Sequence, residues 1–211
     1  IKKLQSKGVN FEGLLAAVPV YYLEDVRENI SQWSMISHLL CVKFLPRTVL
    51  KRLFCHVSDA SQTAAILFSS GSEGQPKGVM LSHRNIMANV KQCADVLNLR
   101  EDDVIMASLP QFHAFGLTVT QFMPLIEGVP MICHADPTDS LGCAKAIAKY
   151  RATFMCGTST FLRLYCSNRR VNPLMLESLR IVVAGAEKLN PAVRKQFKLK
   201  FNKKYARRSF S

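Results

Sequence analysis

Serine, glycine and lysine residues gather between positions 69 and 77, in the stretch "SSGSEGQPK". Glycines allow consecutive backbone N–H groups to converge on an anion, hydroxyls add hydrogen-bond donors, and a lysine adds a positive charge. We therefore interpret this stretch as a phosphate-binding loop. The residues expected to contribute to it are Ser69, Ser70, Gly71, Ser72, Gly74 and Lys77.

The loop differs from the Walker A loop of nucleoside triphosphatases, in which the lysine stands between a glycine and a serine or threonine. Here Pro76 precedes Lys77 and Gly78 follows it. Glu73 is unexpected, because a carboxylate about 4 Å from a phosphate is repelled by ~1 kcal/mol even in water. We expect Glu73 to point away from the phosphate or to hold a cation.

Strand-like and helix-like patterns alternate around and after this loop. The loop follows an apolar strand pattern at 63–68 and leads to a helix pattern at 82–99, for which Ser82 is a suitable N-cap. Further strands are predicted at 103–110, 129–134, 152–157 and 179–186, and further helices at 116–128, 139–150, 159–168 and 190–201. Such alternation predicts an α/β fold in which helices cover a mostly parallel sheet.

The composition is that of a globular chain, since 48% of its 211 residues are hydrophobic. No run approaches the ~18–20 apolar residues that cross a bilayer, and we see no signal-peptide pattern. The seven cysteines are scattered without metal-ligand spacing. We interpret them as reduced core residues and expect a cytoplasmic protein.

Much of the positive charge lies at the end of the chain. The net charge is +13, and residues 193–211 contain no acidic residue. We favour a solvated helix face there, and binding of an anionic partner is the alternative; we expect no nucleic acid. Residues 29–54 are apolar with interspersed basic residues and are interrupted by Pro46. We favour a helix packed on the domain, and contact with a membrane surface is the alternative.

Three sequence blocks together resemble the adenylate-forming, or AMP-binding, superfamily. "SSGSEGQPKG" at 69–78 looks like its phosphate-loop signature, and "LPQFHAFG" at 109–116 is similar to its Leu-Pro-x-Phe-His-x-x-Gly block. "VVAGAEKL" at 182–189 resembles the strand and turn whose backbone packs against adenine. The blocks follow one another in the order and spacing of the superfamily, which makes the resemblance specific.

The resemblance implies roles for individual residues. It implies that His113 borders the pocket for the carboxylate substrate, although a histidine between aromatic residues is more often a core residue. Thr158, Ser159 and Thr160 would line the same pocket, unless they are a plain helix cap. Lys77 and His113 are the catalytic candidates. The residues implied to bind the nucleotide are Ser69, Ser70, Gly71, Ser72, Glu73, Gly74, Lys77, Gly185, Ala186 and Glu187.

The resemblance also implies a reaction. A fatty-acid carboxylate would attack the α-phosphate of ATP in the presence of Mg²⁺, releasing pyrophosphate, and a thiol would then take the acyl group. Glu73, "GTSTF" at 157–161, "AGAEKL" at 184–189 and "YLEDV" at 22–26 resemble one subgroup, the acyl-acyl-carrier-protein synthetase half of bifunctional 2-acylglycerophosphoethanolamine acyltransferases. That subgroup implies acyl carrier protein as acceptor, possible transfer to a lysophospholipid, and a place at the cytoplasmic face of the inner membrane. Coenzyme A is the alternative acceptor.

Several blocks of the superfamily do not occur in these residues. Neither the Tyr-Gly-x-Thr-Glu block, whose glutamate holds magnesium, nor the Thr-Gly-Asp block that binds ribose is present. We therefore expect a central fragment of the large adenylation domain that is inactive alone, with an irregular leading segment at 1–62, a core at 63–205 and a divergent end at 206–211. A fragment of another acyl-CoA or aryl-CoA ligase, or a non-enzymatic remnant with an anion-binding basic end, are the alternatives.

Overall fold

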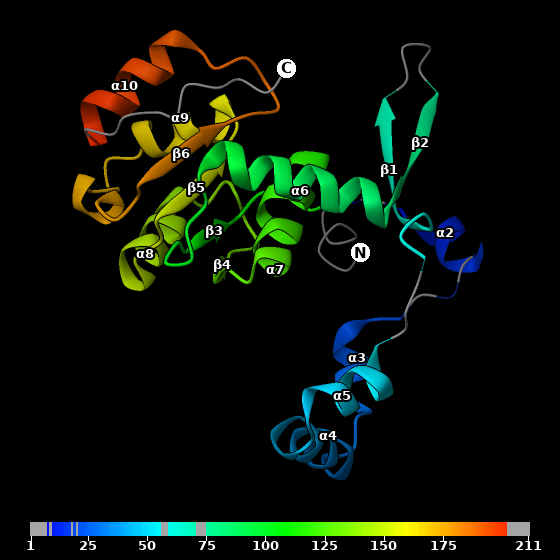
Figure 1. The fold of residues 1–211 in the computed structure, drawn as a ribbon. Helices are drawn as coiled ribbons and strands as arrows, with labels where there is room; N and C mark the ends of the chain where they lie inside the picture. The colour runs from blue at the N-terminus through cyan, green and yellow to red at the C-terminus, as the bar shows by residue number, and fades with distance from the viewer. Residues whose placement is uncertain are drawn as a thin grey trace. The chain divides into compact units, whose positions relative to one another are not determined.

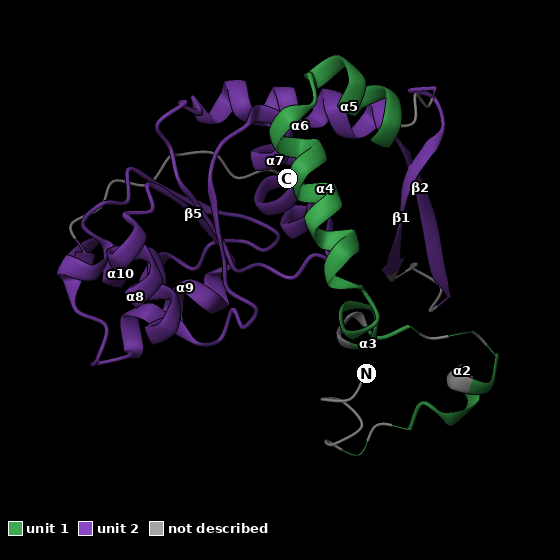
Figure 2. Ribbon diagram, turned by 90° about the horizontal axis from the view of Figure 1, so that it is seen from below, with its two compact units in different colours: residues 1–58 green, residues 59–211 purple. Residues whose placement is uncertain are grey.

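The computed structural model describes residues 8, 10–17, 19, 21–55, 59–70 and 75–201. Its chain forms two compact units, residues 1–58 and residues 59–211 (Figure 2). The first contains the helices α2 (Glu12–Ala17), α3 (Leu23–Glu28), α4 (Gln32–Phe44) and α5 (Arg47–Phe54). The second contains every described strand and the remaining described helices.

The second unit is built on a parallel sheet (Figure 1). Its strand order is β4-β3-β5-β6. The register pairs Ile105 with Met131 and Phe154, and Phe154 with Ile181. The strands are β3 (Ile105–Ala107), β4 (Met131–Cys133), β5 (Phe154–Gly157) and β6 (Ile181–Ala184). The helical elements are α6 (His83–Leu97), η1 (Gly116–Phe122), α7 (Met123–Glu127), α8 (Ser140–Tyr150), α9 (Ser159–Ser167), η2 (Pro173–Leu176) and α10 (Pro191–Phe201).

The hydrophobic core has two halves, one on each face of the sheet. Successive strand residues point to opposite faces, so Met106 and Met155 join one half with α8, α9 and α10. Ile105 and Phe154 join the other half with α6, η1 and α7. Burial on both faces explains why the strands are continuous apolar runs rather than alternating ones. The predicted α/β fold with a parallel, helix-covered sheet is confirmed.

Local signals set the helix boundaries as the sequence predicts. Ser82 caps α6, because its hydroxyl accepts from the Asn85 amide while the Asn85 side chain accepts from the Ser82 amide. Gly128 ends α7 in a left-handed conformation, and Pro191 is the first residue of α10. The predicted helix at 116–128 is composite, since its first seven residues form a π-helix.

A two-stranded antiparallel sheet precedes α6 and corrects the predicted strand–loop–helix order. β1 (Thr63–Ser70) pairs with β2 (Pro76–Ser82), so a second strand stands between the loop and the helix. Gly78 lies under the side chains of Ile66 and Phe68, and a Cβ there would be 3.3 Å from Ile66 Cγ2. The Val-Met-Leu run forms a strand because it pairs with β1. A run of only three apolar residues does not by itself predict a strand.

The first unit contains the predicted segment 29–54. Pro46 separates α4 from α5 and is the N-cap of α5. No residue of either helix is buried. No helix in the described part of the chain is long and apolar enough to cross a membrane.

The cysteines divide between core and surface. Cys93, Cys143 and Cys156 are buried, and burial raises the pKa of each of these thiols. Cys55 and Cys133 are exposed, contrary to the expectation that all seven are core residues. No group of three His, Cys, Asp or Glu side chains among the described residues could hold a metal ion.

Candidate functional site

A cavity of about 550 Å³ opens where the chain leaves the carboxyl ends of β3, β5 and β6. The strand order places β3 and β5 side by side, although the chain passes through β4 between them. In open parallel sheets this switch in direction leaves a crevice, which is the usual ligand site. The cavity is lined by Leu109, Pro110, His113, Ala114, Phe115, Gly116, Thr158, Phe161, Ala186 and Glu187.

The segment that follows β3 brings His113 to the cavity. The chain turns at Pro110, whose carbonyl accepts from the His113 amide at 3.3 Å. The His113 ring is exposed and contacts the Phe112 ring at a centroid distance of 4.5 Å. Gly116 must be small, because a Cβ there would overlap the carbonyl of Pro110. His113 is therefore a surface residue of the cavity and not the buried core histidine of the alternative interpretation.

The turn after β6 forms the facing wall. The Gly185 amide donates to the carbonyl of Gly157 at 3.2 Å, which continues the pairing of β5 and β6. A Cβ on Gly185 would be 2.8 Å from Cζ of Phe115, so only glycine allows the aromatic ring to lie this close. Ala186 has a left-handed φ of 65°, which turns the chain sharply after the strand.

Glu187 connects this turn to the start of α9. Its Oε1 accepts from the Thr160 amide at 2.7 Å. That hydrogen bond is the main cause of a lowered Glu187 pKa; burial opposes it, and further hydrogen bonds from Thr158, Thr160 and the Ser159 amide contribute. A carboxylate at the N-terminus of a helix is also favoured by the helix dipole. Glu187 therefore lines the cavity while its carboxylate is hydrogen-bonded to the first turn of α9.

Residues 158–160, at the start of α9, make a second hydrogen bond to the segment that follows β6. Thr158 is the N-cap of α9 and accepts from the Phe161 amide, so the plain helix cap considered above is present. Thr158 also lines the cavity, whereas Ser159 is buried and accepts from the Asn190 amide at 3.1 Å. Two hydrogen bonds in opposite directions therefore join the β5–α9 junction to the β6–α10 junction.

The predicted phosphate loop lies in the β1–β2 hairpin. Ser69 and Lys77 are opposite each other in the register, and both are exposed. Ser70 is the last residue of β1. Gly71, Ser72, Glu73 and Gly74 lie outside the described residues. Neither Ser69 nor Lys77 belongs to the lining of the cavity, so the structure does not bring these two residues together with His113.

Two aromatic residues of the cavity were not singled out by the sequence. Phe115 supports Gly185, and Phe161 lines the cavity from the first turn of α9. Both lie inside the motif blocks "LPQFHAFG" and "GTSTF". Phe115 is two residues from His113 and Phe161 is next to Thr160, and this closeness to predicted site residues could have indicated them.

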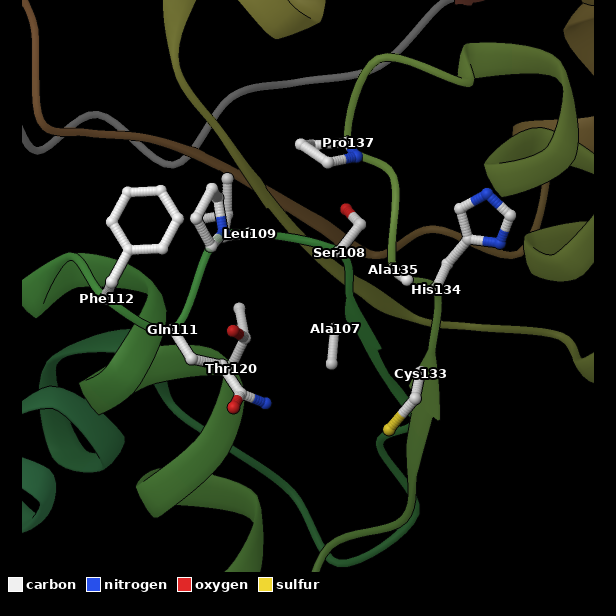
Figure 3. A pocket seen from close by; sticks show the side chains of 11 residues that line it. Ala107, Ser108, Leu109, Gln111, Phe112, Thr120, Cys133, His134, Ala135 and Pro137 are labelled. Carbon is white, nitrogen blue, oxygen red and sulfur yellow. The ribbon is translucent and has the colours of Figure 1, made fainter. Parts of the chain in front are cut away.

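A second cavity of about 740 Å³ lies beyond the ends of β3 and β4 (Figure 3). It shares Leu109 and Pro110 with the first cavity. Figure 3 shows Gln111 on one side and Cys133 and His134 on the other. The His134 Nε2 is 3.3 Å from the Asp139 carboxylate, and Asp139 is in turn the N-cap of α8. His134 is therefore tied to the helix start at the rim of this cavity.

Comparison with known families gives a match over most of the chain. The model of the family described as "AMP-binding enzyme" matches residues 21–207. A long-chain-fatty-acid–CoA ligase of Salmonella typhimurium is 28% identical over 171 residues, which cover 80% of this chain and 28% of the relative. A medium-chain fatty-acid–CoA ligase of Escherichia coli is 33% identical over 128 residues, which cover 61% of this chain and 22% of the relative. The chain thus spans less than a third of the length of these curated relatives.

Solved structures give the same result for the fold. The apo form of MatB from Rhodopseudomonas palustris superposes with a TM-score of 0.64 at 27% identity, covering 72% of this chain and 30% of that one. A fatty acyl-adenylate ligase from L. pneumophila, solved with acyl adenylate and pyrophosphate, superposes with a TM-score of 0.60 at 25% identity. That match covers 70% of this chain and 27% of the other.

Proposed function

The chain belongs to the AMP-binding enzyme family, and from this premise we propose that it is part of an enzyme that activates fatty acids with ATP. In the proposed reaction a carboxylate oxygen of the fatty acid attacks the α-phosphorus of ATP. The bond to the bridging oxygen breaks, and pyrophosphate leaves with that electron pair. The cavity at the ends of β3, β5 and β6 is the observation that carries the proposal, because it combines apolar walls with His113 and with the backbone of a sharp turn.

The proposal assigns tasks to the main predicted site residues. His113 orients the carboxylate at the mouth of the cavity, and Gly185 and Ala186 present backbone to adenine. Glu187 acts through the first turn of α9, so it is a positioning residue. Lys77 and the hydroxyls of the hairpin stabilise the charge that develops on the leaving pyrophosphate, a role in which preorganised donors are most effective.

ATP is the cofactor of this proposal, and Mg²⁺ is the ion that would accompany it. The described residues offer no cluster of carboxylates, histidines or cysteines that fits a metal ion. Glu187 does not fit either, since its carboxylate is engaged by amides of α9. We therefore assign no step to a metal held by these residues.

Binding of an acyl-adenylate analogue to the 211-residue chain tests the cavity. A fatty-acyl sulfamoyladenosine should bind more tightly than AMP, because the acyl chain adds buried apolar area at ~25 cal/mol per Å². His113→Ala should weaken binding of the analogue more than binding of AMP. His38→Ala, in the first unit, is the matched control and should change neither. Equal affinity for AMP and the analogue would contradict the proposed acyl site.

The role of the hairpin in phosphate binding has to be tested by measuring the reaction. This requires a protein that also contains the remaining sequence blocks of the family. Lys77→Ala and Gly74→Val should each slow fatty-acid-dependent exchange between ATP and pyrophosphate, the latter because a β-branched side chain obstructs the approach of the phosphate. Lys145→Ala, an exposed lysine of α8, is the control. Unchanged exchange in both hairpin variants would show that the loop does not handle phosphate. The isolated 211 residues are predicted to show no exchange.

The acceptor thiol has two candidates. Acyl carrier protein, with onward transfer to a lysophospholipid at the cytoplasmic face of the inner membrane, is supported by the subgroup resemblance of "AGAEKL" and "GTSTF". Coenzyme A is supported by the relatives, whose names are those of fatty-acid–CoA ligases. Supplying the longer protein with acyl-adenylate and either thiol distinguishes them by the product formed.

A further inference from the structure

Helices α4 and α5 expose an unusually apolar surface on the first unit (Figure 2, green). The exposed fractions of Trp33 and Phe44 are 80% and 70%, which are values of nearly free side chains. Leu39, Val42, Leu53 and Phe54 are also exposed. Single exposed apolar residues are common, but so many in one short helical segment mark an interaction surface.

The apolar residues of α4 follow a helical spacing. Trp33, Ile36, Leu40 and Phe44 are separated by three and four residues and so lie on one side of the helix. Although α4 is 13 residues long, it measures only ~20 Å, which is less than the ~30 Å of a bilayer core. Such a helix can lie along a membrane surface but cannot cross the membrane.

The charged residues within α4 and α5 themselves are all positive. No aspartate or glutamate occurs between residues 29 and 58, whereas the same stretch contains Lys43, Arg47, Lys51 and Arg52. In α5 the three basic side chains occupy one half of the helical circumference, and the apolar side chains of 49, 50, 53 and 54 occupy the other. The basic half would face anionic headgroups while the apolar half enters the interface.

We propose that α4 and α5 form a binding element for a bilayer surface that contains anionic phospholipid. Apolar burial and attraction between cations and anionic lipid add to each other in this arrangement. Lys43 lies 5.6 Å from the centre of the Phe44 ring, so the cationic and apolar parts are adjacent on the same helix end. The positive charge of α4 and α5 favours lipid over the same two helices of a second copy, since that contact would bring like charges together.

The proposal does not depend on the adenylation chemistry. It involves no residue of the cavity, and its test measures binding to lipid in the absence of ATP and fatty acid. Failure of the lipid test would leave the proposed function unchanged, and failure of the acyl-adenylate test would leave this proposal unchanged.

Vesicle co-sedimentation of the 211-residue chain tests the proposal. Vesicles of phosphatidylcholine mixed with phosphatidylglycerol should bind the chain, and vesicles of phosphatidylcholine alone should bind it at least tenfold more weakly, on the order expected for several surface cations. The variant Lys51→Gln/Arg52→Gln should reduce the partition coefficient by about tenfold or more. Trp33→Ser/Phe44→Ser should reduce it by at least a similar factor through the loss of apolar burial.

The matched control is Lys195→Gln/Lys198→Gln, which removes the same charge from exposed positions on α10. Its partition coefficient should change less than threefold, and circular dichroism should show that every variant keeps its helices. An equal loss in this control would place lipid binding in the basic end of the chain and overturn the proposal. Equal binding to both kinds of vesicle would overturn it too. A dimer in analytical ultracentrifugation that Trp33→Ser/Phe44→Ser abolishes would show that a second copy covers the surface.

Discussion

Asp103 joins the beginnings of three parallel strands, and its replacement gives the sharpest test of the fold. The residue precedes β3, Thr153 precedes β5 and Arg180 precedes β6. Oδ1 of Asp103 accepts from Thr153 Oγ1 at 2.6 Å and from Arg180 Nε at 3.1 Å, and Oδ2 accepts from Arg180 Nη2 and from the Arg100 amide. Asp103→Asn would remove the charge and turn one acceptor into a donor that faces other donors.

The expected loss of unfolding free energy in Asp103→Asn follows from how deeply Asp103 and its partner Arg180 are buried. The Asp103 side chain is 2% exposed and the Arg180 side chain is 24% exposed. Removing one partner of a buried pair costs ~3–5 kcal/mol, but water can partly solvate Arg180, so we expect a loss of about 2–4 kcal/mol. That is a large share of the ~10 kcal/mol typical for a unit of this size. Urea unfolding followed by circular dichroism measures it.

The pH dependence of this loss has a definite sign. Burial alone would raise the pKa of Asp103, but hydrogen bonds from Arg180, Thr153 and the Arg100 amide, with the charge of Arg180, lower it. A carboxyl whose pKa is lowered in the folded state stabilises the fold above its unfolded value of ~3.9. The difference between wild type and Asp103→Asn should therefore be constant near neutral pH and shrink as pH falls through the folded pKa.

The neighbouring exposed Asp102 supplies the control. Asp102→Asn should change the unfolding free energy by less than ~0.5 kcal/mol, as is usual for surface positions. If Asp103→Asn were as stable as Asp102→Asn, or if its deficit did not diminish in acid, the reasoning about the buried pair would be refuted.

Three further predictions concern the elements that shape the cavity. Gly185→Ala should cost ~1–3 kcal/mol because its Cβ would lie 2.8 Å from the Phe115 ring, whereas Gly13→Ala in α2, where nothing lies within 4 Å, should be neutral or stabilising in the same urea titration. Glu187→Gln should cost ~0.5–1 kcal/mol at neutral pH, and the deficit should vanish in acid, because the Glu187 pKa is lowered and its contribution is lost as pH falls through the folded value. Lys200→Met should lower the unfolding free energy by ~1–2 kcal/mol, because Lys200 Nζ donates to the carbonyls of residues 165, 166 and 168 at the end of α9. Thermal unfolding measures this loss, and Lys198→Met, at an exposed position of α10, is the control.

The parallel sheet could be predicted because its strands are buried on both faces. A run such as "ATFMCG" is apolar throughout, and its short length and its place between two helix patterns indicate a central strand. Phe154 and Met155 indeed point into different halves of the core. The predicted strands were too long: the strand expected at 103–110 is β3, which spans only residues 105–107. Leu109 and Pro110 leave the sheet to form the wall of the cavity.

The hairpin and the connections of the cavity could not be predicted from local patterns. β2 needs β1 as its partner, and its own apolar run is only three residues long. The hydrogen bond between Glu187 and the Thr160 amide joins residues 27 positions apart. The resemblance implied that Glu187 binds the nucleotide and that Thr160 lines the substrate pocket, but it did not indicate the hydrogen bond between them.

The shortness of the strands connects stability and site geometry. β3 and β5 span only three and four residues, or ~10–13 Å, between Asp103 and Thr153 at one edge and Leu109 and Thr158 at the other. A slip of one residue would exchange the two faces of a strand and shift the start of α9 relative to the turn after β6. Because Asp103 binds residues immediately before β5 and β6, it opposes such a slip at the edge away from the cavity. It follows that Asp103→Asn should weaken this restraint, and that the hydrogen bond between Glu187 and Thr160 and the cavity should be lost together with the sheet as the variant unfolds.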